Sequence, residues 1–286
     1  MGEGIICDIE RCSMSDGPGI RTVVFFKGCN LRCAWCHNPE SISPAPQLLF
    51  YQEKCTHCGR CAEACPIGAV GTVRCTACGC CTDVCPARAR RISGERMVAS
   101  DVMHHVLADR PFYEASGGGV TFSGGECMLQ MDFLCELLAA CRAEGISTAI
   151  DTAGNVPFDG FDRVLPMTNH LLYDIKCMTP TLHKALTGAD NARILDNYCR
   201  LWHIAPQKLI VRVPIVPGYN AVDDELAHIA NFLRTYPPAE YELLPYHALG
   251  EAKRAALKLC ACASRMPDAQ TMDSCHQLFG ALHGPA

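Results

Sequence analysis

Short apolar runs alternate with longer amphipathic segments along most of the chain. Six of these runs have the β-branched and aromatic content of strands, at 23–26, 120–123, 147–150, 171–173, 209–213 and 241–244. Because successive strands that are separated by helices pair in parallel, the alternation predicts an α/β fold with crossover helices. Six strands are two fewer than a closed (β/α)8 barrel contains, so we expect a partial (β/α)6 TIM-like barrel.

The amphipathic segments predict helices that cover the outside of this barrel. One helix, which Gly145 ends, presents an apolar face made of Phe133, Leu134, Leu137, Leu138 and Cys141. A second helix begins at Thr179-Pro180 and turns Leu182 and Leu186 inward. A third helix over 223–234 buries Leu226, Ile229, Ala230 and Leu233. We also expect a C-terminal helix over 267–282 that packs on the barrel.

Polar residues and glycines lie at or just beyond the ends of the predicted strands. They are Gly124, Gly125, Glu126, Asp151, Thr152, Asp174, Ile175, Lys176, Arg212 and His247. In barrels of parallel strands, the face at the C-terminal strand ends carries the active site. We therefore expect these residues to converge on one mouth, together with a group of three cysteines that follows the first strand.

Composition narrows the class of protein. The formal charge is −5, which argues against a nucleic-acid binder held by bulk charge. No run approaches about 18 uninterrupted apolar residues, and the first residues lack the basic and apolar regions of a secretory signal. We therefore expect neither a membrane span nor secretion. The 22 cysteines in 286 residues then indicate metal clusters in a reducing, cytoplasmic and anaerobic setting rather than a disulfide scaffold.

Eight of the cysteines form an internal repeat. Each half reads C-x-x-C-x-x-C-x-x-x-C-P, the bacterial ferredoxin run in which the fourth cysteine ligates the other cluster. The repeat predicts one [4Fe–4S] cluster on Cys55, Cys58, Cys61 and Cys85, and another on Cys75, Cys78, Cys81 and Cys65. We expect a ferredoxin-like insert over 50–92 that splits the barrel into 1–49 and 93–286. Two zinc sites built from paired C-x-x-C units are the alternative, although the doubled run with its prolines is more specific.

The insert is more basic than the rest of the chain. Residues 54–91 contain six basic and two acidic residues, a local charge of +4 in a chain of −5. This excess is either an ordinary solvated face or a docking patch for an acidic electron donor such as flavodoxin or ferredoxin.

The first cysteine group has a different spacing. Cys29, Cys33 and Cys36 form C-x-x-x-C-x-x-C with no fourth cysteine nearby, so a four-iron cluster on these thiolates would keep one iron open. The motif resembles that of the radical S-adenosylmethionine (SAM) enzymes, in which the open iron chelates the amino and carboxylate groups of SAM. Trp35 fits the aromatic residue that this family places beside the adenine. The alternative is a chance cluster of three thiols in a cysteine-rich chain.

The neighbouring residues resemble one subgroup of that family. Asp16-Gly-Pro-Gly-Ile-Arg21, together with Cys29 through His37-Asn38-Pro39, is similar to the glycyl-radical-enzyme activating enzymes, and the resemblance runs from about 5 to about 258. It implies an enzyme, similar to the pyruvate formate-lyase activating enzyme, that reductively cleaves SAM to a 5′-deoxyadenosyl radical. That radical takes a hydrogen from a backbone glycine of a partner glycyl radical enzyme. The partner could be a dehydratase, a C–N or C–S lyase, a decarboxylase or a succinate-adding synthase, and we expect a monomeric activator.

The resemblance also implies roles for the strand-end residues. Gly124, Gly125 and Glu126 match the segment that pairs with the amino group of SAM. Lys176 matches a partner of its carboxylate, while Asp174, with Asp151 and Thr152, matches a site for SAM or a monovalent cation. Trp35, Cys36, His37, Ile175, Arg212 and His247 match positions beside SAM. For the charged residues, the plainer interpretation is an ordinary ion pair or a helix cap.

Two other functions remain open on the sequence. A pure electron carrier would use the ferredoxin module on an inert barrel, but the three-cysteine motif and the strand-end residues argue against it. A radical SAM enzyme acting on a small molecule would share the cysteine motif, and the segment 16–21 disfavours it.

Overall fold

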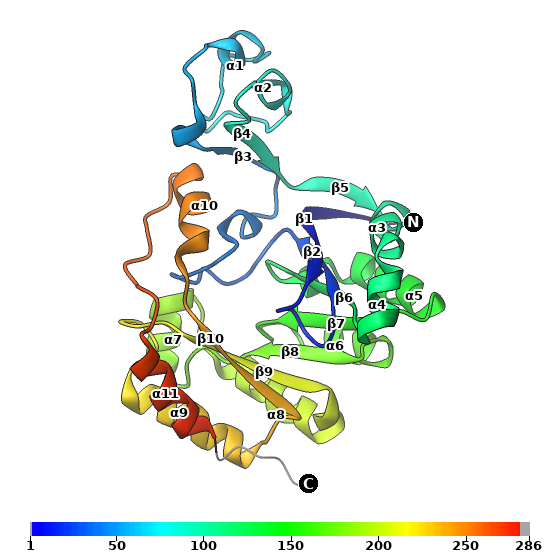
Figure 1. The fold of residues 1–286 in the computed structure, drawn as a ribbon, viewed down its shortest axis with the longest axis vertical. Coiled ribbons are helices and arrows are strands. Elements are labelled where there is room, and N and C mark those ends of the chain that lie inside the picture. Colours follow the sequence, from blue (N-terminus) through cyan, green and yellow to red (C-terminus); the bar gives the residue numbers. More distant parts are fainter. Residues whose placement is uncertain (1, 281–286) are drawn as a thin grey trace.

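An open, mostly parallel sheet forms the body of the molecule (Figure 1). The computed structural model describes residues 2–280. Its eight-stranded sheet has the order β10-β9-β8-β7-β6-β2-β1-β5. The six parallel strands are β2 (Arg21–Phe26), β6 (Gly119–Gly124), β7 (Ser147–Thr152), β8 (His170–Asp174), β9 (Leu209–Ile215) and β10 (Glu240–Pro245). The predicted α/β fold and its six strands are confirmed.

Two antiparallel strands extend the sheet beyond the prediction. β1 (Glu3–Ser13) pairs with β2, and β5 (Glu95–Val98) pairs with β1. The charged and polar residues in the second half of β1 leave much of it exposed, which is why it lacks the apolar signature of the other strands. Because β10 and β5 stand at opposite edges, the sheet curves without closing.

The helices lie on the outer face of the sheet. They are α3 (Ala99–Ala108), α4 (Arg110–Ser116), α5 (Met131–Ala143), α6 (Asp159–Val164), α7 (Pro180–Thr187), α8 (Ala192–Ile204), α9 (Asp223–Thr235) and α11 (Ala269–Phe279). The helix α10 (Glu251–Ala256) lies apart from them and contacts the short strand β3 (Gln47–Phe50) and the turn at Pro39–Ser41 (Figure 1). α5 and α9 bury the apolar faces that the sequence predicts. α11 packs on α9 and β10, as expected, while the predicted helix end at 282 lies outside the described residues. None of the helices within 2–280 is long and apolar enough to cross a membrane.

The prediction for α7 was wrong about which face is buried. His183 and Thr187 are the buried side chains, whereas Leu182 and Leu186 are only half-buried. The reason is that the last turn of α7 meets the loop that carries the three cysteines. Thr187 also accepts a main-chain hydrogen bond from that loop, so its position is set by the site rather than by the apolar core.

A buried arginine, Arg21, lies at the end of the barrel where the parallel strands begin. The guanidinium of Arg21 donates to Thr121 Oγ1 at 2.7 Å, to the carbonyl of Val120 at 2.7 Å and to that of Pro18 at 3.0 Å. Burial lowers the pKa of Arg21 to about 10. These bonds hold the segment 14–20 across the N-terminal ends of the strands, where Asp16 reaches the interior.

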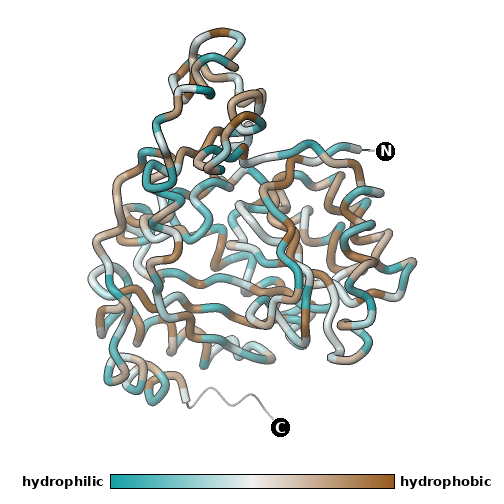
Figure 2. The backbone as a smooth tube through the Cα atoms, turned by 45° about the horizontal axis from the view of Figure 1, so that its top comes forward, coloured by the Kyte–Doolittle hydropathy of each residue, from teal (hydrophilic) through white to brown (hydrophobic). Residues whose placement is uncertain are grey.

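A small unit projects from the body between two short strands (Figure 2). β3 (Gln47–Phe50) and β4 (Arg90–Ser93) form a separate antiparallel sheet. Between them the chain makes two single-turn helices, α1 (Arg60–Glu63) and α2 (Cys80–Asp83). The repeated cysteines all lie in this segment.

Candidate active site

The loop with the first three cysteines follows β2 and is fixed by its main chain. Cys29 N donates to the carbonyl of Ile42 at 3.0 Å. Further along, Arg32 N donates to Thr187 O at 2.6 Å and Ala34 N to Leu186 O at 2.9 Å. The last turn of α7 therefore supplies carbonyls that would otherwise be unpaired at a helix end, and these hold the loop in register.

The three thiols lie close enough to interact electrostatically. Burial raises the pKa of Cys29 and of Cys36 to about 12, and it also raises that of Cys33. Cys33 adds to the effect at Cys29 and Cys36, and Cys29 adds to it at Cys36, while Lys176 opposes it at Cys29 and Cys33. Three converging, desolvated thiols beside a cation suit a metal cluster that takes up thiolates.

The geometry does not suit a single metal ion. Among the residues that the structure describes, no three His, Cys, Asp or Glu side chains gather in a group that could hold one ion. In a four-iron cluster each thiolate binds a different iron, so the thiolates stand farther apart than the ligands of one zinc ion.

Two glycines at the end of β6 let the cysteine loop come close. Gly125 N donates to Phe26 O at 2.9 Å, and Glu126 N donates to Gly28 O at 2.8 Å. A Cβ on Gly125 would lie 2.2 Å from Gly28 O, and one on Gly124, whose φ is +113°, would lie 2.3 Å from the backbone of Phe26. Only glycine therefore permits this approach of β6 to the start of the loop.

The carboxylate of Glu126 is turned into the structure. It accepts hydrogen bonds from Thr152 Oγ1 at 2.8 Å and from Ala153 N at 3.1 Å. Burial raises the pKa of Glu126 to about 7. Glu126 and Thr152 thus join the ends of β6 and β7, and the main chain of the Gly-Gly-Glu segment is the part left to face a ligand.

Lys176 follows β8 and forms an ion pair with Asp174. Burial opposes the charged form of Lys176, but Asp174 and Cys33 outweigh that cost, so its pKa is raised. Asn220 Nδ2 donates to the carbonyl of Lys176 at 2.8 Å, and Ile175 N donates to Arg212 O at 3.0 Å. The segment that carries Lys176 is therefore held from both sides.

A second charged layer lies deeper in the barrel, around Arg212. Its Nη1 is 3.4 Å from Asp151 and 3.8 Å from Asp16, and its Nε is 3.4 Å from Glu242. Burial raises the pKa of Asp151 to about 6, although Arg212 opposes the shift and Ser123 donates a hydrogen bond of 2.7 Å. Arg212 is thus placed among three carboxylates, below the cysteine loop.

Sequence reasoning missed Glu242 as a member of this layer. Glu242 lies directly opposite Arg212 in the parallel pairing of β10 with β9. The only sequence feature that could have indicated its role is that Glu242 is a lone acidic residue inside the apolar run 241–244. It could not be assigned to the inner face without the register of the sheet.

The remaining predicted residues flank the cysteine loop. Trp35 packs edge-on against Tyr219, with ring centroids 6.0 Å apart, and the rings of His37 and His247 meet at right angles 4.4 Å apart. Among the described residues, His247 Nδ1 is buried and has no hydrogen-bond partner. A Cβ on Gly250 would lie 3.0 Å from Cys36 O, so the chain after β10 closes over the loop.

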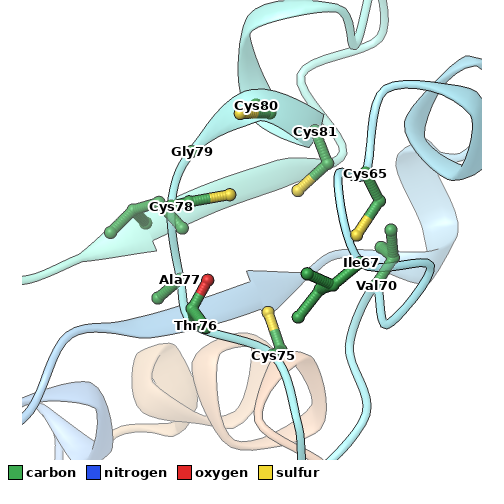
Figure 3. A pocket seen from close by; sticks show the side chains of 11 residues that line it. Cys65, Ile67, Val70, Cys75, Thr76, Ala77, Cys78, Gly79, Cys80 and Cys81 are labelled. Carbon is green, nitrogen blue, oxygen red and sulfur yellow. The ribbon is translucent and has the colours of Figure 1, made fainter.

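A second group of thiols lines a cavity in the projecting unit. Figure 3 shows the side chains of Cys65, Cys75, Cys78 and Cys81 pointing into this space, and Cys80, at the start of α2, also lines it. One cysteine of the first half of the repeat thus meets three of the second half, as the ferredoxin pairing requires.

Replacing Gly125 by alanine tests the close approach of β6 to the cysteine loop. Because the new Cβ would overlap Gly28 O, the loop must shift, and we expect a loss of about 1–3 kcal/mol in the free energy of unfolding. Anaerobic urea unfolding measures the loss. Gly160→Ala is the control, because its Cβ meets only the flexible methyl ends of Met131 and Met128. Equal stability of the two variants would contradict the proposed packing.

Known proteins resemble this chain over most of its length. It is 41% identical over 266 residues to an isethionate sulfite-lyase activating enzyme of Desulfovibrio desulfuricans, covering 88% of this chain and 85% of the relative. It is 40% identical over 262 residues to a trans-4-hydroxy-L-proline dehydratase activating enzyme of Clostridioides difficile, covering 87% of this chain and 86% of the relative. A choline trimethylamine-lyase activating enzyme of Oleidesulfovibrio alaskensis is 39% identical over 268 residues, covering 88% and 86%.

Solved structures and a family model agree with these relatives. A domain of a pyruvate-formate lyase-activating enzyme from Bacteroides vulgatus, 29% identical, covers 58% of this chain and 94% of its own, with a TM-score of 0.50. A radical SAM methyltransferase from Sphaerobacter thermophilus shares the fold at a TM-score of 0.58 and 14% identity, and the match covers 98% of this chain and 76% of the methyltransferase. The 4Fe-4S binding domain matches residues 49–71. The sequence identity to activating enzymes, taken with the site at the strand ends, shows that the chain belongs to the glycyl-radical-enzyme activating enzymes of the radical SAM family.

Proposed function

We propose that this activating enzyme holds its catalytic [4Fe–4S] cluster on Cys29, Cys33 and Cys36 and binds SAM beside it. The observation that carries the proposal is the convergence of three half-buried thiols beside Lys176, on the loop that follows the C-terminal end of the parallel strand β2. When bound, the cluster and SAM together supply a 5′-deoxyadenosyl radical for hydrogen abstraction from a glycine of the partner enzyme. The chain itself supplies orientation and the exclusion of water.

The residues around the loop suit the groups of SAM. Lys176 offers a positive charge to the carboxylate, and the main chain of Gly124, Gly125 and Glu126 offers carbonyls to the amino group. Trp35, His37 and His247 lie on the side that closes over the loop and are assigned to the adenosyl part. The unpartnered Nδ1 of His247 supports this assignment, because a buried polar atom of this kind calls for a ligand.

A monovalent cation is proposed between Asp151 and Asp174. Each carboxylate already has a basic partner, Arg212 or Lys176, yet Asp174 still raises the pKa of Asp151. A small cation would relieve that repulsion between like charges. Thr152, whose hydroxyl binds Glu126, stands at the edge of this position.

We assign two further clusters to the projecting unit, taken as residues 50–92, with 1–49 and 93–286 forming the barrel. Cys75, Cys78, Cys81 and Cys65 hold one cluster, and their shared cavity supports this set. The other set is Cys55, Cys58, Cys61 and Cys85. The unit would accept electrons from an acidic flavodoxin or ferredoxin, and the activator would work as a monomer on a glycyl radical enzyme.

Iron content tests the three-cluster assignment. Three four-iron clusters give about twelve irons per chain after anaerobic reconstitution, and replacing Cys29, Cys33 and Cys36 together by alanine leaves about eight. The same variant loses SAM cleavage. Cys80→Ala serves as the control, since it removes a cysteine that lies within the second run but does not match the repeat, and it keeps about twelve irons. A triple variant that retains the full iron content would show that the catalytic site is assigned wrongly.

The transfer of hydrogen from a glycine tests the function. Anaerobic mixing with SAM, a reductant and the glycyl radical enzyme encoded beside this protein should give an organic radical with a doublet EPR signal. With deuterium on the glycines of that enzyme, the label should appear in 5′-deoxyadenosine. Consumption of SAM without label or protein radical, with every co-encoded candidate, would instead indicate a small-molecule substrate.

Salt dependence tests the docking of an acidic donor on the basic unit. Salt limits the range of electrostatic attraction between exposed charges to about 10 Å at 0.1 M ionic strength. Activation driven by reduced flavodoxin should therefore slow as the salt concentration rises. Activation driven by a small uncharged photoreductant is the control and should change little. Identical rates with flavodoxin at low and high salt would rule out the electrostatic patch.

A further inference from the structure

The projecting unit is built in layers that run outward from the barrel. α2 packs on β4, and α1 packs on α2, so α1 stands farthest from the body (Figure 1). Each helix carries the third cysteine of one half of the repeat: Cys81 on α2 and Cys61 on α1. Cys81 is buried, whereas Cys61 is partly exposed. The two sets of cysteines are therefore not equivalent with respect to the barrel.

The cavity lined by Cys65, Cys75, Cys78 and Cys81 faces inward. Ile92 of β4 forms part of its wall, and Figure 3 shows the cavity over the strands β3 and β4. The other set of cysteines, Cys55, Cys58, Cys61 and Cys85, extends to the solvent-facing surface of the unit. Its member Cys85 lines an open hollow there with Arg60, Glu63 and Asp83. One cluster position thus lies against the sheet that joins the barrel, and the other lies at the solvent side.

A packed path leads from the inner cavity to the cysteine loop of the active site. α10 contacts β3, and Lys258, just beyond α10, donates to the carbonyl of Gly71, next to the cavity residue Val70, at 3.4 Å. At the other end of α10, Lys253 Nζ donates to Asn38 Oδ1 at 2.8 Å and lies 2.7 Å from Glu40.

Gly250, directly before α10, touches the carbonyl of Cys36. The same helix therefore contacts the inner side of the projecting unit and the chain that follows the third active-site cysteine.

We infer that the two clusters act in a fixed order, with the set Cys65, Cys75, Cys78 and Cys81 as the inner relay. The inference rests on the proposed function of the unit. Electron tunnelling falls steeply with distance, so an electron from a low-potential one-electron donor enters at the outer set Cys55, Cys58, Cys61 and Cys85. It passes to the inner set and then to the cluster at Cys29, Cys33 and Cys36. Each cleavage of one SAM consumes one electron and releases one methionine.

Counting electrons tests the order. Cys55 and Cys75 occupy equivalent places in the repeat and are both half-buried, so Cys55→Ala and Cys75→Ala form a matched pair. Each protein is reconstituted, checked for iron, reduced fully with photoreduced deazaflavin, freed of reductant and mixed with SAM without a partner. Methionine is counted, and EPR records any cluster that stays reduced. Cys80→Ala is again the control.

The relay predicts a different count for each variant. Wild type and Cys80→Ala release about three methionines per chain, one for each reduced cluster. Cys55→Ala, with about eight irons, releases about two, because the inner relay still delivers its electron. Cys75→Ala also holds about eight irons but releases about one, and its outer cluster stays reduced in the EPR spectrum.

Other results would overturn the order or the function behind it. The reverse pattern, with the stranded cluster in Cys55→Ala, would show that the outer set is the relay. Equal yields of about two from both variants would show independent routes. About one methionine from every protein, wild type included, would show that the projecting unit does not feed the active site, so the proposed function of the unit would fail.

If Cys55→Ala or Cys75→Ala loses both clusters of the projecting unit, the experiment uses Cys55→Ser or Cys75→Ser instead. An oxygen ligand at Cys55 or Cys75 would mark its cluster with a changed EPR spectrum while the cluster stays bound. Magnetic broadening of the active-site signal should then accompany reduction of the cluster marked at Cys75. Broadening that follows the cluster marked at Cys55 would contradict the inferred order.

Discussion

The close main-chain contact between the ends of β2 and β6 is the constraint on which the site depends. Gly28 and Gly125 meet at a separation that no side chain would tolerate, and two hydrogen bonds keep them there. Cys29 follows at once, so the position of the first thiol is set by strand pairing rather than by a free loop. Glu126 extends the same support to β7 through Thr152. The loop with Cys29, Cys33 and Cys36 thus begins on a rim made by adjacent strands, which is a rigid way to build a site.

The charges inside the barrel are arranged in two layers. Near the thiols, Lys176 and Asp174 neutralise each other. Deeper down, Arg212 faces Asp16, Asp151 and Glu242, so carboxylates outnumber the guanidinium. Burying these groups is costly unless they are paired, and the surplus of negative charge is held close to the place assigned to SAM. A sulfonium cation would find a complementary field there.

The sequence predicted those parts of the molecule that carry a local signal. Apolar runs revealed the six parallel strands, and the periodicity of α5 and α9 revealed their buried faces. β1 was missed because its outer half is polar, and α7 was misjudged because its buried face serves the cysteine loop instead of the core. The cysteine spacings pointed to clusters and grouped Cys65 with the second half of the repeat, and these four side chains line one cavity. Register likewise decided that Glu242 faces Arg212.

The central claim is that the cluster on Cys29, Cys33 and Cys36 keeps one iron open for SAM. Electron–nuclear double resonance on the reduced protein, with SAM labelled by ¹⁵N in its amino group and by ¹⁷O in its carboxylate, tests this most directly. The account predicts hyperfine coupling from both labels to the cluster, and its loss when Cys29, Cys33 and Cys36 are replaced. Coupling from neither label, in a protein that contains the cluster and is saturated with SAM, would contradict the account.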